Sequence, residues 1–194
     1  MPQIFRILPE EGVLHILTRG NNRQKVFEDG HDYKTYLKFL KLYRQDNKIS
    51  ICHYCIMPNH AHLIVAITQE SALSKFMKQL NLAYLHHHKK RYKYVGHLWQ
   101  GRYKSLIISE DEYLITCGRY IELNPVRARI VEDPKDYEYS SYNAYAYGRK
   151  DEIVEYSPMY RELGKSMKER QLNYRKDIKE ELYKDDVNLN ARFI

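Results

Sequence analysis

Hydrophobic positions along the chain change their spacing several times, and each spacing predicts a different element. The apolar stretch at residues 13–18 predicts a short strand, followed by a polar loop. Residues 31–46 repeat apolar side chains at helical intervals, which predicts a helix. Two further apolar runs, residues 49–56 and 60–67, flank a turn sequence at Met57-Pro58-Asn59 and predict a β-hairpin.

The middle of the chain continues this alternation of helices and strands. A helix with Ser71 as its N-cap is expected next, and residues 103–108 form the last predicted strand. The run Ser109-Glu110-Asp111-Glu112 has the form of a capping box, so a further helix should begin there. It should stop close to Asn124, because Pro125 disfavours helical geometry in the residue before it. This order predicts an α+β fold, in which helices cover one face of a ferredoxin-like antiparallel sheet.

The composition changes near residue 148. Residues 148–194 hold eleven Lys or Arg and ten Asp or Glu, with few apolar side chains to bury. We therefore predict one domain over residues 1–147, followed by a charged, partly helical C-terminal tail over residues 148–194. Residues 166–184 could form an exposed helix in that tail, and we assign it no chemistry.

Composition narrows the cellular context. No apolar stretch approaches the roughly 20 residues that cross a bilayer, and the first residues lack a signal-peptide pattern, which predicts a cytoplasmic protein without a membrane segment. The three cysteines, Cys52, Cys55 and Cys117, are an odd number and are expected to be buried thiols. A zinc site at Cys52 and Cys55 is disfavoured, because strand positions three apart face opposite sides and no second cysteine pair exists.

Positive charge is concentrated in one segment. The net charge is +7, yet residues 71–109 contain no Asp or Glu and contribute +8, so the other 155 residues sum to −1. A local basic surface with interleaved aromatic side chains is typical of single-stranded nucleic-acid binding, in which rings stack on bases and cations follow the phosphates. The alternative is a solvated, lysine-rich helix end. The DNA-binding candidates in this segment are Lys89, Lys90, Arg91, Trp99, Arg102 and Lys104.

Two histidines at alternate positions are the strongest chemical signal. Successive strand side chains point to opposite faces, so His60 and His62 in Asn59-His60-Ala61-His62-Leu63 point the same way. Two imidazoles aimed at one spot can hold a metal ion. The alternative is that both are ordinary half-exposed strand histidines.

A second candidate element is the helix that follows residue 109. Tyr113, Thr116, Tyr120 and Asn124 fall on one narrow helical stripe, and Asn124 lies roughly 6 Å along the axis from Tyr120. A phenol and an amide oxygen can thus address the same point. Combined with the histidine pair, such an open set of nitrogen and oxygen ligands suits Mg²⁺ or Mn²⁺ in phosphoryl transfer. Glu122 points to another face and is a poor general base.

Three segments in this order resemble one family. Residues 57–63, 98–105 and 120–126, with Tyr139-Ser140-Ser141-Tyr142 at the end of the match, are similar to the single-tyrosine HUH transposases, in particular the REP-associated tyrosine transposases. The resemblance implies an HUH endonuclease fold, with Tyr120 as the nucleophile. It also implies that His60 and His62 bind the metal, and that Asn124 occupies the position of a third ligand.

The resemblance also implies a reaction and a substrate. Attack of a phenol on a phosphodiester leaves a 5′-phosphotyrosine and a free 3′-hydroxyl, which conserves the bond for rejoining. The expected substrate is single-stranded DNA with hairpin or palindromic repeats, which makes the protein nucleoid-associated. Each further candidate for DNA contact has plain surface charge as its alternative: Arg19, Asn21, Arg23, Arg127 and Arg129.

Three questions stay open from the sequence. One tyrosine gives one covalent intermediate at a time, so a complete event needs either a homodimer or two sequential reactions. A rolling-circle initiator or relaxase-like protein would share the two histidines and a helical tyrosine. A catalytically silent module that binds hairpin DNA would keep the fold alone.

Overall fold

The computed structural model describes residues 8–108 and 111–191, with side chains given over these ranges except at residues 111–113 and 184–191. The strands are β1 (Gly12–Arg19), β2 (Ser50–Met57), β3 (His60–Ile67) and β4 (Lys104–Ile108). The helices are α1 (Gly30–Asp46), α2 (Leu73–Tyr92), α3 (Asp111–Glu122), α4 (Asn124–Arg127), α5 (Tyr142–Tyr147), α6 (Pro158–Glu162) and α7 (Met167–Ala191), with short 3₁₀ turns η1 (Asn21–Arg23) and η2 (Pro134–Asp136).

The four strands form one antiparallel sheet in the order β2-β3-β1-β4. The chain order β1-α1-β2-β3-α2-β4 with this strand order is the ferredoxin-like arrangement that the sequence predicted. In the register of β1 and β3, Leu17 lies opposite His62 and Arg19 lies opposite His60. Residues opposite one another share a face of the sheet, so this register determines which side chains can meet.

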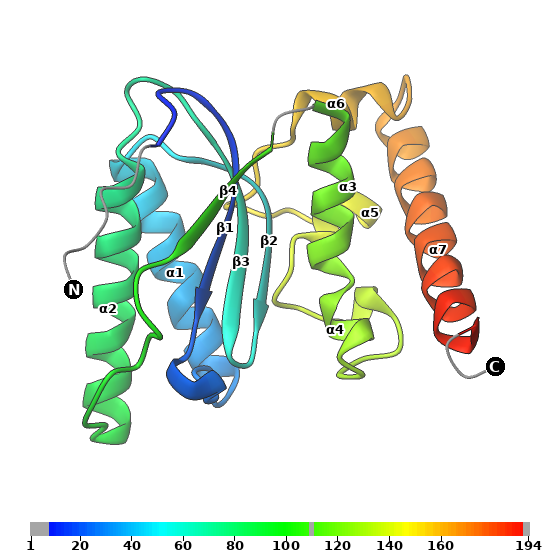
Figure 1. Ribbon diagram of the computed structural model, residues 1–194. Coiled ribbons are helices and arrows are strands. Elements are labelled where there is room, and N and C mark those ends of the chain that lie inside the picture. The colour runs from blue at the N-terminus through cyan, green and yellow to red at the C-terminus, as the bar shows by residue number, and fades with distance from the viewer. Residues whose placement is uncertain (1–7, 109–110, 192–194) are drawn as a thin grey trace.

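One face of the sheet, here called the α1/α2 face, is closed by α1 and α2 (Figure 1). Leu14 and Ile16 of β1 are completely buried there, as are Phe76 and Tyr84 of α2. This face holds the larger hydrophobic core, to which all four strands or their flanking segments contribute. Its buried side chains fix the positions of the strands that also form the other face.

The opposite face, here called the α3 face, is covered by α3 (Figure 1). Leu114 and Ile121 of α3 pack on Cys55 of β2 and Ile64 of β3. The expectation that helices cover only one face is therefore wrong. Because α3 follows the complete ferredoxin-like unit and has its own apolar stripe, it buries that stripe against the only side of the sheet that α1 and α2 leave uncovered.

The C-terminal region also corrects an expectation. Tyr174 and Ile178 of α7 are buried in a second core with Tyr145 and Tyr160, so the predicted exposed helix is buried along one side. Two side chains one turn apart are enough to join α7 to this core, because residues 142–160 supply the remaining aromatic surface. The domain boundary at residue 148 stays a prediction.

Helix ends differ from the sequence predictions in detail. The N-cap of α2 is Ala72, and the Ser71 hydroxyl instead donates to the carbonyl oxygen of Lys48. The predicted capping box at Ser109 lies outside the described residues. α3 ends at Glu122, near the expected position, and Asn124 begins α4 instead of ending α3.

Two further features concern the cysteines and the apolar character of the helices. Cys52, Cys55 and Cys117 are free thiols. Cys52 and Cys55 are buried, as expected, whereas Cys117 is only half-buried, so the expectation is wrong for that residue. Within the described segments, none of the helices combines the length and apolar character that a bilayer crossing requires.

Candidate active site

The paired histidines lie where β3 leaves the hairpin turn. His60 and His62 are half-buried while Ala61 and Leu63 between and beside them are buried, which is the alternation that a strand imposes. Their ring centroids are 4.8 Å apart and the rings are nearly perpendicular, at 84°. Both rings therefore project from the α3 face toward a common region, as the sequence predicted.

A third histidine joins them from β1, and sequence reasoning missed it. His15 Nε2 lies 2.8 Å from His62 Nδ1, and the two rings stack with centroids 5.0 Å apart. The sequence contains His15 in a predicted strand, but it does not show that this strand lies beside β3 or in which register. The histidine cluster is therefore a product of sheet topology.

Burial keeps these imidazoles uncharged. Desolvation, followed by the positive charge of Arg19, lowers the pKa of His60 to about 4. Desolvation, with smaller effects of the neighbouring histidines, lowers the pKa of His62 to about 3, and burial also lowers the pKa of His15. At neutral pH the imidazole rings of His60 and His62 are consequently neutral, which is the form that binds a metal ion.

Hydrogen bonds leave the same nitrogen available on both rings. His60 Nδ1 lies 2.5 Å from Asn59 Oδ1, and His62 Nδ1 is paired with His15. Nε2 of each ring makes no hydrogen bond among the described residues, so two Nε2 atoms can face a cation while Nδ1 is held from behind. The described residues contain no cluster of three or more His, Cys, Asp or Glu suited to a metal. Two imidazole nitrogens leave further coordination positions for neutral oxygens, phosphate or water, which is the character of an open site.

Tyr120 lies on the same side of the sheet. It projects from α3 with 52 % of its surface exposed, although α3 is otherwise a core helix. Tyr120 and His15 line one cavity of about 430 Å³, together with Thr116 and Cys117 of α3 and residues 106–108 of β4. The phenol of α3 and His15, the hydrogen-bond partner of His62, therefore border a shared space into which a substrate could enter.

Arg127 lies against Tyr120. Its guanidinium carbon is 4.6 Å from the centroid of the Tyr120 ring, and its Nη1 donates to the Tyr120 carbonyl oxygen at 2.9 Å. Its Nη2 donates to Glu181 of α7 at 3.1 Å. These contacts place a cation beside the candidate nucleophile and connect that nucleophile to α7.

Glu122 anchors α3 two residues beyond Tyr120. Its carboxylate is completely buried and contacts His53 at 3.0 Å, the Ser141 hydroxyl at 2.5 Å and the Tyr174 hydroxyl at 2.7 Å. The partners come from β2, from the segment before α5 and from α7. Glu122 thus faces away from Tyr120, as predicted, and its buried hydrogen bonds hold the helix that carries the phenol.

Asn124 begins α4, which contacts β2. Its side chain is half-buried and makes no hydrogen bond to another described residue. In Figure 1, α4 lies at the same end of the sheet as the β2–β3 turn. The role of Asn124 as a third ligand stays a prediction.

The basic candidates fall into two groups. Arg19 lies opposite His60 in the register of β1 and β3, and Lys104 shares the α3 face because it lies opposite Leu17. Lys89 and Lys90 are exposed at the C-terminal end of α2, beside α1, and thus belong to the other side of the sheet. Arg23 is exposed in η1. Figure 1 shows η1, the β2–β3 turn and the C-terminal end of α2 at one end of the molecule.

Some of these candidates already have structural partners. Arg91 donates to Asp29 and Asp32, joining α2 to the start of α1. Trp99 Nε1 donates to the carbonyl oxygen of Asn81, and the ring packs against the core. Two other candidates, Arg102 and Arg129, are exposed, and the backbone NH of Asn21 donates to the Leu98 carbonyl oxygen. Their contact with DNA stays a prediction.

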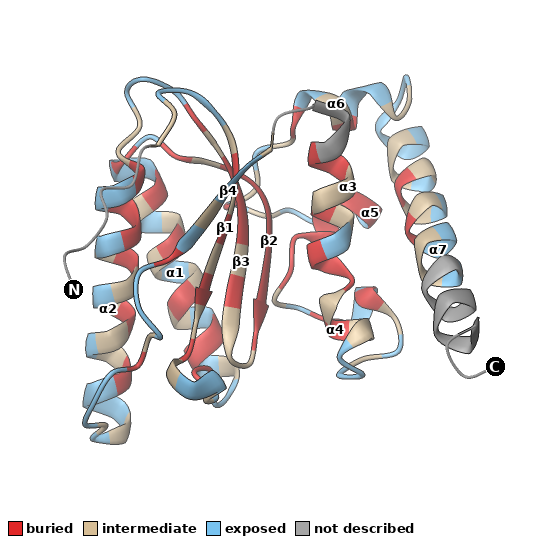
Figure 2. Cartoon of the chain, in the orientation of Figure 1, coloured by how far each residue is buried: buried red, intermediate tan, exposed pale blue. Residues whose placement is uncertain are grey.

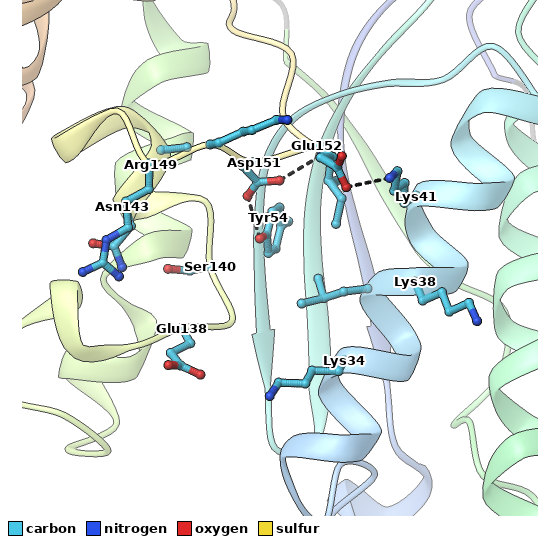
Figure 3. Close-up of a pocket in the computed structure, with 14 residues that line it drawn as sticks. Lys34, Lys38, Lys41, Tyr54, Glu138, Ser140, Asn143, Arg149, Asp151 and Glu152 are labelled. Carbon is cyan, nitrogen blue, oxygen red and sulfur yellow. Dashed lines mark hydrogen bonds and ion pairs between the residues drawn. The ribbon is translucent and has the colours of Figure 1, made fainter.

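A separate cavity of about 600 Å³ lies between α1, β2 and residues 138–153 (Figure 3). Lys34, Lys38 and Lys41 of α1 border it, but Lys41 is paired with Glu152 at 2.6 Å. The Tyr54 hydroxyl donates to Asp151 at 2.8 Å on the same wall. None of the predicted site residues lines this cavity, so its lysines are basic residues that lie apart from the histidines.

Comparisons with known proteins bear on the family and the fold of this chain. Residues 10–124 match the family described as "Transposase IS200 like". The chain is 30 % identical over 128 residues to a Haemophilus influenzae protein whose name assigns it to the REP-associated tyrosine transposases, a match that spans 57 % of this chain and 73 % of that protein. The fold is similar to a REP-associated tyrosine transposase solved with a REP hairpin, with a TM-score of 0.65, 18 % identity, and coverage of 81 % of this chain and 93 % of that chain.

Proposed function

Because this chain belongs to the IS200-like transposase family, we propose that it cuts and rejoins single-stranded, hairpin-flanked DNA with Tyr120 as the nucleophile. The observation that carries the proposal is the shared cavity, which Tyr120 of α3 lines together with His15, the partner of His62. A nucleophile that must reach a phosphodiester has to be accessible, and Tyr120 is half-exposed at this cavity.

The reaction is a transesterification. The Tyr120 oxygen attacks the scissile phosphorus, the bond to the 3′-oxygen breaks, and the phenol proton is lost while the departing 3′-oxygen gains one. The DNA 5′ end is then held as a phosphotyrosine. Attack by a 3′-hydroxyl on this ester reverses the step, so strands can be rejoined without an external energy source.

The histidines supply the metal-binding part of the site. We propose that His60 and His62 hold Mg²⁺ or Mn²⁺ through their Nε2 atoms, with Asn124 as a third ligand. When bound, the cation would polarise the scissile phosphate and stabilise its developing negative charge. Arg19 beside His60 and Arg127 beside Tyr120 would add positive charge where the phosphate must lie.

Basic residues at one end of the molecule support the proposed substrate class. η1 and the C-terminal end of α2 present Arg23, Lys89 and Lys90 to solvent near the β2–β3 turn (Figure 1). A flexible single strand could follow these cations to the histidines, whereas a hairpin would fix which phosphate reaches them.

The test is covalent capture of DNA. End-labelled, hairpin-flanked single strands are incubated with the full chain and Mn²⁺ or Mg²⁺, and protein–DNA adducts are separated under denaturing conditions. The wild type should form an adduct, and Tyr120→Phe should not. Tyr147→Phe is the matched control, because Tyr147 is also exposed, at 43 %, and also lies beneath an arginine, Arg175.

The remaining outcomes decide between the alternatives. DNA binding by the wild type without an adduct would identify a silent hairpin-binding module. An adduct that persists in Tyr120→Phe would move the nucleophile to another residue. Replacing Lys89 and Lys90 by Ala should weaken DNA binding, whereas the same change at Lys34 and Lys38, which border the distant cavity, should not.

A further inference from the structure

We propose that His15 is a positioning residue that accepts a hydrogen bond from His62 and thereby aims His62 Nε2 at the metal, an inference that rests on the proposed function. His15 lies on β1, directly opposite Ile64 of β3 and Leu106 of β4. It is therefore diagonal to His62 on the same face. The 2.8 Å separation of His15 Nε2 and His62 Nδ1 is a full hydrogen bond, and the rings stack at 24°.

The chemistry of the pair determines its direction when a metal is bound. A histidine that binds a cation through Nε2 must carry its proton on Nδ1. His62 would then donate from Nδ1, and the His15 Nε2 atom must be the acceptor, which leaves the proton of His15 on Nδ1. Among the described residues, no carboxylate hydrogen-bonds to the His15 ring, and the hydrogen bond to His62 is the one hydrogen bond of that ring with a polar side chain.

The same arrangement occurs at the other histidine. Asn59 Oδ1 lies 2.5 Å from His60 Nδ1 and can act only as an acceptor, which requires the proton of His60 on Nδ1. Each of the two rings is thus held from behind by an acceptor: a side-chain amide for His60 and an imidazole for His62. A hydrogen-bonded acceptor behind a ligating histidine fixes the tautomer and the orientation of its ring.

His15 lies between His62 and the cavity that Tyr120 lines. It is half-buried between β3 and β4, and the cavity shared with Tyr120 begins at its ring. A shift of the His62 ring would therefore alter both the metal and the space into which the phosphate must fit. The Tyr120 phenol itself would remain in place, because α3 is anchored separately through Glu122.

The experiment measures Mn²⁺ binding to the full chain by calorimetry, without DNA. His15→Phe keeps a stacking ring and removes the acceptor, so its dissociation constant for Mn²⁺ should rise about 10- to 100-fold. His15→Gln restores an acceptor oxygen and should recover a large part of that loss. His86→Phe is the matched control, because His86 is an exposed histidine of α2, and its affinity should equal that of the wild type.

Each outcome has a definite meaning. Equal Mn²⁺ affinity of wild type and His15→Phe would overturn the role of His15, and so would a loss in His15→Gln as large as that in His15→Phe. A wild type that binds no Mn²⁺ would instead overturn the metal site of the proposed function. Thermal unfolding of each variant verifies folding, and His15→Leu replaces His15→Phe in the comparison if the latter does not fold.

Discussion

The two faces of the sheet are formed by the same strands but bury their side chains to different extents. On the α1/α2 face, Leu14 and Ile16 of β1 are completely buried. On the α3 face, the alternate residues Val13, His15 and Leu17 are only half-buried. The difference arises because two long helices close one face, whereas α3 covers mainly β2 and leaves a cavity over β1 and β4.

A single strand, β3, contributes both to the hydrophobic core and to the candidate active site. In β3, Ala61 and Leu63 complete the core on the α1/α2 face while His60 and His62 face α3. A register shift of one residue would exchange the two sets and destroy both. Figure 2 shows how burial varies across the sheet: β2 is buried along nearly its whole length, whereas β4 is largely exposed.

The largest expected effect is a loss of activity on the α3 face. His62→Ala removes a proposed metal ligand, so the rate of adduct formation should fall on the order of 10²–10³-fold, corresponding to several kcal/mol of transition-state stabilisation. Circular dichroism and thermal unfolding should show a folded chain. An unchanged rate in the covalent capture assay would contradict the assignment of His62.

The next largest effect is a loss of stability on the α1/α2 face. Ile16→Ala should lower the free energy of unfolding by about 2–5 kcal/mol, because it leaves a cavity in a fully packed core. Leu17→Ala, at the neighbouring position of the same strand, should cost clearly less, since Leu17 is half-buried on the α3 face. Urea titrations of both variants measure this difference, and equal losses would refute the distinction between the faces.

A smaller effect is expected at the anchor of α3. Glu122 accepts three buried hydrogen bonds, and Glu122→Gln replaces one of its acceptor oxygens by an NH2 group that faces another donor. The free energy of unfolding should therefore fall by about 1–3 kcal/mol. Glu132→Gln, at an exposed glutamate, serves as the control and should leave stability unchanged. If both variants unfolded at the same denaturant concentration, the proposed anchor would have no energetic support.

The smallest effect is a pH dependence of stability. Burial lowers the folded-state pKa of His60 to about 4 and of His62 to about 3, below the unfolded value of about 6.5. Between these values the unfolded chain binds more protons, so stability is complete above about pH 6.5 and decreases as the pH falls toward 4. Each of the two shifts alone would correspond to about 2 kcal/mol between about pH 7 and about pH 5, and solvent screening of these half-exposed rings reduces the expected loss to the order of 1 kcal/mol. Replacing both histidines by Gln should flatten this part of the profile, and a profile that stays equally steep would assign it to other groups.

The sequence predicted the parts of this architecture that depend on local periodicity. The alternation around Ala61 correctly placed His60 and His62 on one face, and the order of strands and helices predicted the ferredoxin-like sheet. Helical spacing also predicted that Tyr120 shares one stripe of α3 with Thr116, and both side chains line the same cavity. Each of these features is a property of one element or of neighbouring elements.

Features that depend on which distant elements meet were not predictable from the chain alone. His15 joins His62 only because β1 lies beside β3 in a particular register. The burial of Tyr174 depends on a core assembled from α5, α6 and α7, which no local pattern reveals in a highly charged segment. The same holds for α3, whose apolar stripe did not indicate which face of the sheet it would cover.

The central claim is that the imidazoles of the sheet and the phenol of α3 address one cation-binding site. The most direct test is anomalous diffraction from crystals of the full chain soaked in Mn²⁺. Our account predicts a single strong manganese peak within bonding distance of the Nε2 atoms of both His60 and His62, on the side of the sheet that carries Tyr120. Manganese bound elsewhere, or no peak at the histidine pair when Mn²⁺ is in excess, would contradict it.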